Sequence, residues 1–211
     1  MLTDRCRVGG AVRAAAASLL FLAIAAPSFG QRPPTPTRIR GAIESVDGDV
    51  LNVKSRSGEL FKIHVGPDAR VVDIVKISLA DVKNGSYIGA TGMPQPDGSQ
   101  KAVEVHVFPE VQRGTGEGFR PFDLQPNSTM TNATVTETVV NNDGKTLTVK
   151  YKDGEKKIIV SADTPVVTYE PGQRSELIAG AKIIATVASK PDGSLELSRI
   201  AVGRDGLTPP M

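Results

Sequence analysis

Cysteine is nearly absent from this chain of 211 residues. The one cysteine, Cys6, precedes the apolar run near the N-terminus, whereas a lipoprotein needs its cysteine just after such a run. We therefore do not expect lipid anchoring. Beyond residue 30 the chain has no cysteine at all, which excludes a disulfide, a thiol nucleophile and a cysteine-type metal site from that part of the sequence.

Long apolar runs are absent as well. The run from Ala14 to Ala26 has about 13 residues, too few to cross roughly 30 Å of hydrocarbon. Arginines precede the run, and small residues follow it at the two positions that a signal peptidase reads. This pattern predicts a secretory signal over residues 1–30, cleaved before Gln31 or, alternatively, near Ala25. We expect a periplasmic or secreted protein that is soluble after cleavage, without stable membrane insertion.

An excess of charge of one sign is also missing. The chain has 25 Lys and Arg against 23 Asp and Glu, and the predicted signal holds three arginines and one aspartate, so 22 of each sign remain. Tryptophan is absent, and only four phenylalanines and three tyrosines lie beyond residue 30. Single-stranded nucleic acid needs a basic groove with stacking aromatic rings. We therefore expect no nucleic-acid partner, and the same shortage of aromatic rings disfavours a glycan groove.

What the chain does have is an internal repeat, which begins at Asp47 and again at Asp143. The first copy reads DGDVLNVKSRSGELFKIHVGPDARVV and the second reads DGKTLTVKYKDGEKKIIVSADTPVV. Identical or similar residues match at an offset of 96, which becomes 95 after one residue is lost. The match ends at Pro96-Asp97-Gly98-Ser99 against Pro191-Asp192-Gly193-Ser194. One register kept across about 60 residues indicates a duplication.

Within each copy the apolar period is that of β-strands, with turn signals such as Asp47-Gly48-Asp49 between the runs. Residues 78–85 begin with a serine and end with a glycine, which predicts one or two helical turns. The second copy repeats this scheme from 133 to 202, with its helical piece at 175–180. The predicted strands of the first copy are 39–46, 50–54, 60–65, 87–93 and 102–108.

Three strands, a short helix and a hairpin, in this order, favour an OB-type barrel. We therefore predict an all-β chain of two tandem OB-like small β-barrels, each with one short helix. Each unit of about 70 residues would be marginally stable alone, so we expect the barrels to pack against one another. The predicted segments are a Pro-rich lead-in at 31–38, the first barrel at 39–109, a Gly-rich linker at 110–130, the second barrel at 131–205 and a C-terminal tail at 206–211.

Alternation along the strands of the first copy predicts which side chains face the barrel interior. This inward set is Val46, Leu51, Val53, Phe61, Ile63, Val65, Ile88, Val103, Val105 and Val107.

These motifs carry a family resemblance. The opening GAIESVDGDVLNVKSRSGE, the centre SLADVKNGSYIGATG and the close PDGSQKAVEVHVFPE resemble the bacterial domain of unknown function family numbered 5666. The resemblance covers residues 38–204, including the linker. It implies an exported protein with OB-like domains, often doubled, and it brings no agreed activity or catalytic residues.

The two histidines are the first candidates for chemistry. His64 and His106 alternate with the inward side chains, so both should face outward, and the matching positions of the second copy are Ile159 and Ala201. Together with Glu104 they would form a metal site if their strands run side by side. Exposed histidines without a ligand are the competing interpretation.

The linker offers two further candidates. The stretch from Gly114 to Gly118 lacks the Gly-Lys-Ser/Thr ending of a phosphate-binding loop, so it predicts a flexible joint. Phe119 and Phe122 follow it, either as anchors for a partner or as a plug in the seam between the barrels, and we favour the seam. No Gly-x-Ser-x-Gly motif is present, and we predict no catalytic residue and no cofactor.

The sequence therefore favours an exported, non-enzymatic binding or adaptor protein of the bacterial cell envelope. Its expected partner is another envelope protein, or a small ligand held between the barrels. The alternative is a periplasmic metal- or ion-binding protein that uses the outward histidines and nearby carboxylates. A hydrolase with an unrecognised site is a weaker option.

Overall fold

The computed structural model describes residues 37–211. The predicted signal, 1–30, lies outside the described residues, as does most of the predicted lead-in. Thr37 and Arg38, which the sequence assigned to that lead-in, begin the first strand. The described chain is mainly β, as predicted, and its helical segments are 3-10 turns of three residues each. None of the helices in residues 37–211 has the length and apolar character needed to cross a membrane.

The elements follow the chain in this order: β1 (Thr37–Asp47), β2 (Val50–Ser55), β3 (Leu60–His64), β4 (Arg70–Lys76), η1 (Leu79–Asp81), β5 (Tyr87–Pro94), β6 (Gln100–Val107), η2 (Glu110–Gln112), β7 (Gly118–Pro121), β8 (Thr129–Asn141), β9 (Gly144–Tyr151), β10 (Gly154–Ser161), β11 (Val166–Pro171), η3 (Arg174–Glu176), β12 (Lys182–Ser189), β13 (Leu195–Gly203) and η4 (Arg204–Gly206).

Ten of these strands close into two five-stranded barrels. In the first, hereafter the β1 barrel, the ring runs β1-β2-β3-β13-β12 and returns to β1. In the second, hereafter the β5 barrel, the ring runs β8-β9-β10-β6-β5 and returns to β8. Each ring has one parallel contact, β3 with β13 and β10 with β6, and the other contacts are antiparallel.

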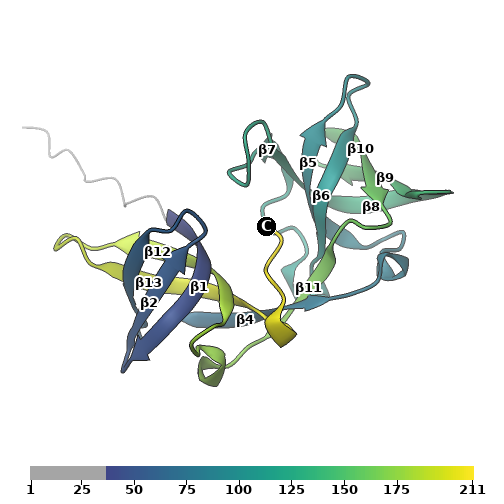
Figure 1. Ribbon diagram of the computed structural model, residues 1–211. Helices are drawn as coiled ribbons and strands as arrows, with labels where there is room; N and C mark the ends of the chain where they lie inside the picture. The colour runs from purple at the N-terminus through teal and green to yellow at the C-terminus, as the bar shows by residue number, and fades with distance from the viewer. Residues whose placement is uncertain (1–36) are drawn as a thin grey trace, which may run out of the picture. The chain divides into compact units, whose positions relative to one another are not determined.

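Each barrel combines strands from both copies of the repeat. The β1 barrel takes three strands from the first copy and the last hairpin, β12–β13, from the second, while the β5 barrel has the opposite composition. Figure 1 shows the purple β1 and β2 beside the yellow-green β12 and β13. The predicted limits 39–109 and 131–205 are therefore wrong as barrel limits. Because both copies present the same inward pattern, strand pattern alone does not reveal which copy supplies the hairpin.

The two copies thus exchange their last hairpins, an arrangement hereafter called strand exchange. A two-stranded ribbon joins the barrels where the chain crosses from one barrel to the other. β4 and β11 pair with each other in antiparallel register, β4 also pairs with β13, and β11 also pairs with β6. Ile74 faces Tyr169 in this ribbon, and these two residues are equivalent in the repeat, at an offset of 95. The pseudo-twofold axis that relates the copies therefore passes through this pair. Sequence analysis predicted neither β4 nor β11.

Each barrel has its own apolar core. Most of the predicted inward set is buried there, whereas Val46 is 40 % exposed. Val103 is not in the core because β6 has a bulge at this position: Thr91 pairs with Glu104, but the next residue, Gly92, pairs with Ala102. The bulge places Ala102 in the core instead.

The first short helix forms where the sequence predicts it. The Ser78 hydroxyl accepts a hydrogen bond from the Ala80 N–H at 3.1 Å, and the Asp81 carboxylate accepts one from the Ser78 N–H at 2.9 Å. This is a capping box. The helical turn predicted for the second copy is η3, which begins at Arg174, one residue before its predicted start.

The predicted linker and tail both take part in the fold. Within the linker, η2 forms and β7 pairs with β8, so this segment is not a simple flexible joint. In the tail, Met211 is buried, its sulfur accepts a hydrogen bond from the Tyr169 hydroxyl at 3.0 Å, and Arg56 donates to the Pro209 carbonyl.

Candidate ligand-binding site

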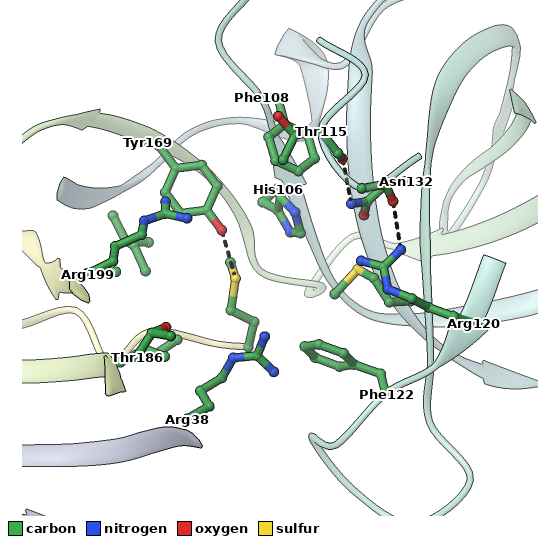
Figure 2. Close-up of a pocket in the computed structure, with 16 residues that line it drawn as sticks. Arg38, His106, Phe108, Thr115, Arg120, Phe122, Asn132, Tyr169, Thr186 and Arg199 are labelled. Atoms are coloured by element: carbon green, nitrogen blue, oxygen red, sulfur yellow. Dashed lines mark hydrogen bonds between the residues drawn. The ribbon is translucent and has the colours of Figure 1, made fainter. Parts of the chain in front are cut away.

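A cavity of about 230 Å³ is lined by side chains from both barrels, from the ribbon and from the segment that carries β7. Figure 2 shows three arginines, Arg38, Arg120 and Arg199, on different sides of this space, with His106 and Asn132 on the wall between them. The volume is below the 300–1,000 Å³ of sites for drug-sized ligands. The cavity therefore suits a small molecule.

The wall that the β5 barrel contributes is a row of three residues across three strands. Gly89 on β5 pairs with His106 on β6 and with Asn132 on β8. A Cβ at Gly89 would lie 2.1 Å from His106 Nε2 and 2.8 Å from Asn132 Oδ1. The absence of a side chain at Gly89 thus allows the imidazole and the carboxamide to lie over the same strand.

A buried carboxylate orients His106. The carboxylate of Glu104, which is fully buried, lies 3.3 to 3.4 Å from His106 Nδ1. It also accepts hydrogen bonds from the Thr91 hydroxyl at 2.6 Å and from the Thr91 N–H at 3.2 Å. Because a carboxylate accepts hydrogen bonds, an imidazole with one proton places it on Nδ1 here and leaves Nε2 as an acceptor.

Asn132 contributes the second acceptor. Its Nδ2 donates to the Thr115 carbonyl at 3.0 Å, and the residue is 4 % exposed. Its Oδ1 is buried and has no hydrogen-bond partner among residues 37–211. A buried carbonyl oxygen without a donor is uncommon in folded proteins and costs about 1–3 kcal/mol. This atom therefore requires a donor from outside the described chain.

The opposite wall has the same architecture but different chemistry. The equivalent row in the β1 barrel places Ile184 on β12 between Arg40 on β1 and Ala201 on β13. Ile184 and Ala201 line the cavity. The two rows, related by the duplication, have therefore diverged: one carries two acceptors, and the other has Ile184 and Ala201 at the positions equivalent to Gly89 and His106.

The arginines make the cavity basic, since no Asp or Glu side chain is among the described residues that line it. Arg38 is bonded to Asp123 at 2.7 Å, Arg120 donates to the Gly116 carbonyl at 2.7 Å, and Arg199 lies 5.0 Å from the centre of the Tyr169 ring. Arg120 and Arg199 thus have no carboxylate partner among residues 37–211. Burial alone would raise the pKa of the Asp123 carboxyl, but a hydrogen bond from Arg40 and the charges of Arg38 and Arg40 hold it below its usual value.

Aromatic rings line the space between the polar groups. The Phe122 ring lies 5.0 Å from the Arg38 guanidinium, and the rings of Phe108 and Tyr169 contact His106 at 4.7 and 5.6 Å between centroids. Burial, and secondarily the charge of Glu104, raises the pKa of the Tyr169 hydroxyl. Tyr169 therefore remains a neutral donor.

The predicted metal set is not brought together. His64 is exposed at the end of β3 and lines a different cavity, with Asp49 and Glu196. Only Glu104 and His106 are in contact, and residues 37–211 contain no group of three His, Cys, Asp or Glu side chains placed to hold a metal ion.

The orientation predicted for His106 was correct, but its predicted exposure was not. His106 alternates with core residue Val105 and points out of its barrel, yet it is only 3 % exposed because Phe108 and Tyr169 cover it. Of the linker residues, Phe122 lines the cavity. Phe119 is 40 % exposed, outside the cavity, with Lys156 Nζ 4.7 Å from its ring centre.

Sequence reasoning missed Asn132, Gly89 and the arginines of the cavity. An isolated glycine inside a strand is a signal of close approach by another group, and Gly89 lies within the strand predicted over 87–93. Asn132 and the arginines have no local signal, since strand exchange brings the two walls together. No protein-family model, curated protein or solved structure matches this chain.

Proposed function

We propose that this protein is an exported, non-enzymatic binding protein of the bacterial cell envelope that holds a small ligand in the cavity of Figure 2. The observation that carries the proposal is the buried Oδ1 of Asn132, a residue that lines this cavity, because that atom has no hydrogen-bond donor from residues 37–211. A bound molecule with a donor group would satisfy it.

The geometry around His106 favours binding over catalysis. Nucleophilic catalysis needs a hydroxyl or thiol within hydrogen-bond reach of the base. Among the described residues, the hydrogen-bond partner of His106 is Glu104, and no hydroxyl bonds to the imidazole. The pair therefore orients a binding group.

The fold and the N-terminal sequence support the cellular setting that we propose. Each barrel combines a three-stranded meander with a hairpin that closes the ring; the hairpin follows the meander in the β1 barrel and precedes it in the β5 barrel. The order in the β1 barrel is consistent with an OB-like barrel, and OB-like barrels bind ligands on their surfaces. The predicted signal over 1–30 and the resemblance to the exported family numbered 5666 favour the periplasm or the exterior.

Native mass spectrometry tests the proposal on protein released from the periplasm by osmotic shock, without refolding or chelator. We expect an additional mass of a small organic molecule on the wild-type chain. Asn132→Ala should lose most of it, whereas Asn142→Ala, at an exposed position in the β8–β9 turn, should retain it. A bare chain that also shows no thermal shift with any member of a small-molecule library would refute the proposed function.

A further inference from the structure

The chemistry of the cavity identifies a class of ligand, provided that the proposed function holds. Its most buried polar groups are two acceptors, His106 Nε2 and Asn132 Oδ1, which both lie beside the position of a Gly89 Cβ. They are therefore close enough for one donor group to serve both. A hydroxyl or an N–H can do so, whereas a carboxylate placed there would face two acceptors and be repelled.

The arginines of the cavity require the opposite chemistry. Arg38 and Arg120 are exposed and Arg199 is half-buried. A carboxylate matches the planar guanidinium group and can form two parallel hydrogen bonds with it. Arg38 is already bonded to Asp123, and Arg120 lies on the side of Asn132, since a Cβ at Gly116 would be 3.2 Å from Asn132 Nδ2 and 3.3 Å from Arg120 Nη2 (Figure 2). Arg199, on the side of Tyr169, is therefore the arginine that an incoming carboxylate would neutralise.

Between these two ends the lining is aromatic and aliphatic. Phe122, Tyr169, Ile74 and Ile184 contribute rings and branched side chains, and the cavity volume of about 230 Å³ leaves room for a single ring system. We propose that the ligand is a small aromatic carboxylic acid that carries a hydrogen-bond donor on the ring, opposite the acid. The donor points to His106 and Asn132, and the carboxylate lies at Arg199.

The divergence of the two copies supports a single binding orientation. If the cavity had kept its twofold symmetry, acceptors would stand on both walls. Instead, Ala201 and Ile184 occupy the positions equivalent to His106 and Gly89, and neither side chain offers an acceptor. A ligand with one donor end and one acidic end matches this asymmetry.

Isothermal titration of the full chain with four probes tests the proposal. The probes are 4-hydroxyphenylacetate, phenylacetate without the donor, tyramine with an ammonium in place of the carboxylate, and inorganic phosphate. We expect 4-hydroxyphenylacetate to bind roughly tenfold more tightly than phenylacetate, the effect of one buried hydrogen bond. Tyramine and phosphate should not bind measurably.

Two variants separate the ends of the site. Asn132→Ala should abolish the preference for 4-hydroxyphenylacetate over phenylacetate and leave phenylacetate binding in place. Arg199→Gln should weaken the binding of both acids and keep the preference. Lys156→Gln, which removes a cation outside the cavity, is the matched control. It should change neither the affinity for the two acids nor the preference between them.

The outcomes distinguish this inference from the proposed function. Tyramine binding as tightly as the acid, phosphate binding alone, or a preference that survives Asn132→Ala would overturn the inferred ligand class. Each of these results would still leave a ligand-binding protein. If no probe binds and the native chain carries no retained molecule, the proposed function itself fails. The probe series uses the wild-type chain, so it is decisive even if a variant does not fold.

Discussion

At Gly89 the backbone of β5 leaves room for two side chains from neighbouring strands. Any side chain here would overlap the His106 imidazole, whose Nε2 would be 2.1 Å from the new Cβ. The imidazole is held by Glu104 and packed against Phe108, so it has little freedom to move. We predict that Gly89→Ala lowers the free energy of unfolding by about 1–3 kcal/mol, measured by urea denaturation.

Gly66→Ala is the control for this prediction. Its added Cβ would contact only the end of the Glu196 side chain, at 2.8 Å. That side chain is flexible and partly exposed, so the change should stay within about 0.5 kcal/mol. The double variant Gly89→Ala, His106→Ala should recover part of the lost stability. Equal effects of the two glycine substitutions would contradict the packing described for Gly89.

Asp123 gives a pH-dependent contact between the linker segment and β1. It bonds to Arg38 at 2.7 Å and to Arg40 at 2.9 Å, and its pKa is below the usual 3.8. A lowered folded-state pKa contributes stability above the unfolded value and loses it as the pH falls through the folded value. Asp123→Asn should therefore destabilise the chain at pH 7 by at most about 1 kcal/mol.

The same substitution should matter less in acid. Thermal melts of Asp123→Asn and wild type should converge as the pH falls below about 4, because the wild-type carboxyl then takes up its proton. High salt at pH 7 should also reduce the difference, since the contact is partly exposed. A difference that persists unchanged at pH 3 would show that the charge is not responsible.

Among the elements, equivalent bulges in β6 and β13 explain why the alternation of side chains along a strand predicted some buried positions correctly and others wrongly. Val103 and Ser198 are the extra residues, at an offset of 95. Alternation correctly placed Leu51, Val53 and Ile63 in a core. It cannot detect an inserted residue, and it cannot show that an outward face is covered by another part of the chain, as happens at His106.

A charged contact fixes the β4–β11 ribbon to the last helical turn. Asp73 on β4 is 1 % exposed and accepts hydrogen bonds from Arg204 Nη2 at 2.6 Å and Nε at 3.0 Å. Arg204 also bonds to Glu170 on β11. We predict that Arg204→Gln lowers the melting temperature, because it leaves a buried carboxylate without its counter-ion.

The Arg204–Asp73 contact suggests a conservative variant and a control for Arg204→Gln. Arg204→Lys should recover little stability, since an ammonium cannot reproduce the two bonds of the guanidinium. Lys54→Gln is a suitable control, because Lys54 and its partner Glu44 both lie on the surface and the change should have little effect. Equal melting temperatures for Arg204→Gln and wild type would contradict a structural role for the ion pair.

At the scale of the whole molecule, strand exchange predicts how separated halves behave. Residues 118–211 contain three strands of the β5 barrel and two strands of the β1 barrel. In the exchanged arrangement, this fragment can complete a ring only with a second copy of itself or with residues 37–117. We expect the purified fragment to have twice its own mass by light scattering, and to form a one-to-one complex when mixed with 37–117.

The alternative is a folded monomer of 118–211, with β12 and β13 folded back onto β8, β9 and β10. Such a monomer would mean that β11 can bend, and it would restore the arrangement of one barrel per copy. Circular dichroism and a cooperative melt would distinguish it from an unfolded fragment. That result would contradict the role we assign to the β4–β11 ribbon.

Strand exchange also constrains the order in which the barrels can form during synthesis. The strands of the β5 barrel are complete once residue 161 has been made, whereas β1, β2 and β3 must wait for β12 and β13 near the end of the chain. Until then, the first-made strands are a sheet with two open edges, which are sites for wrong pairing. A cell that makes this protein must therefore keep the two edges of its oldest sheet unpaired until its newest segment arrives.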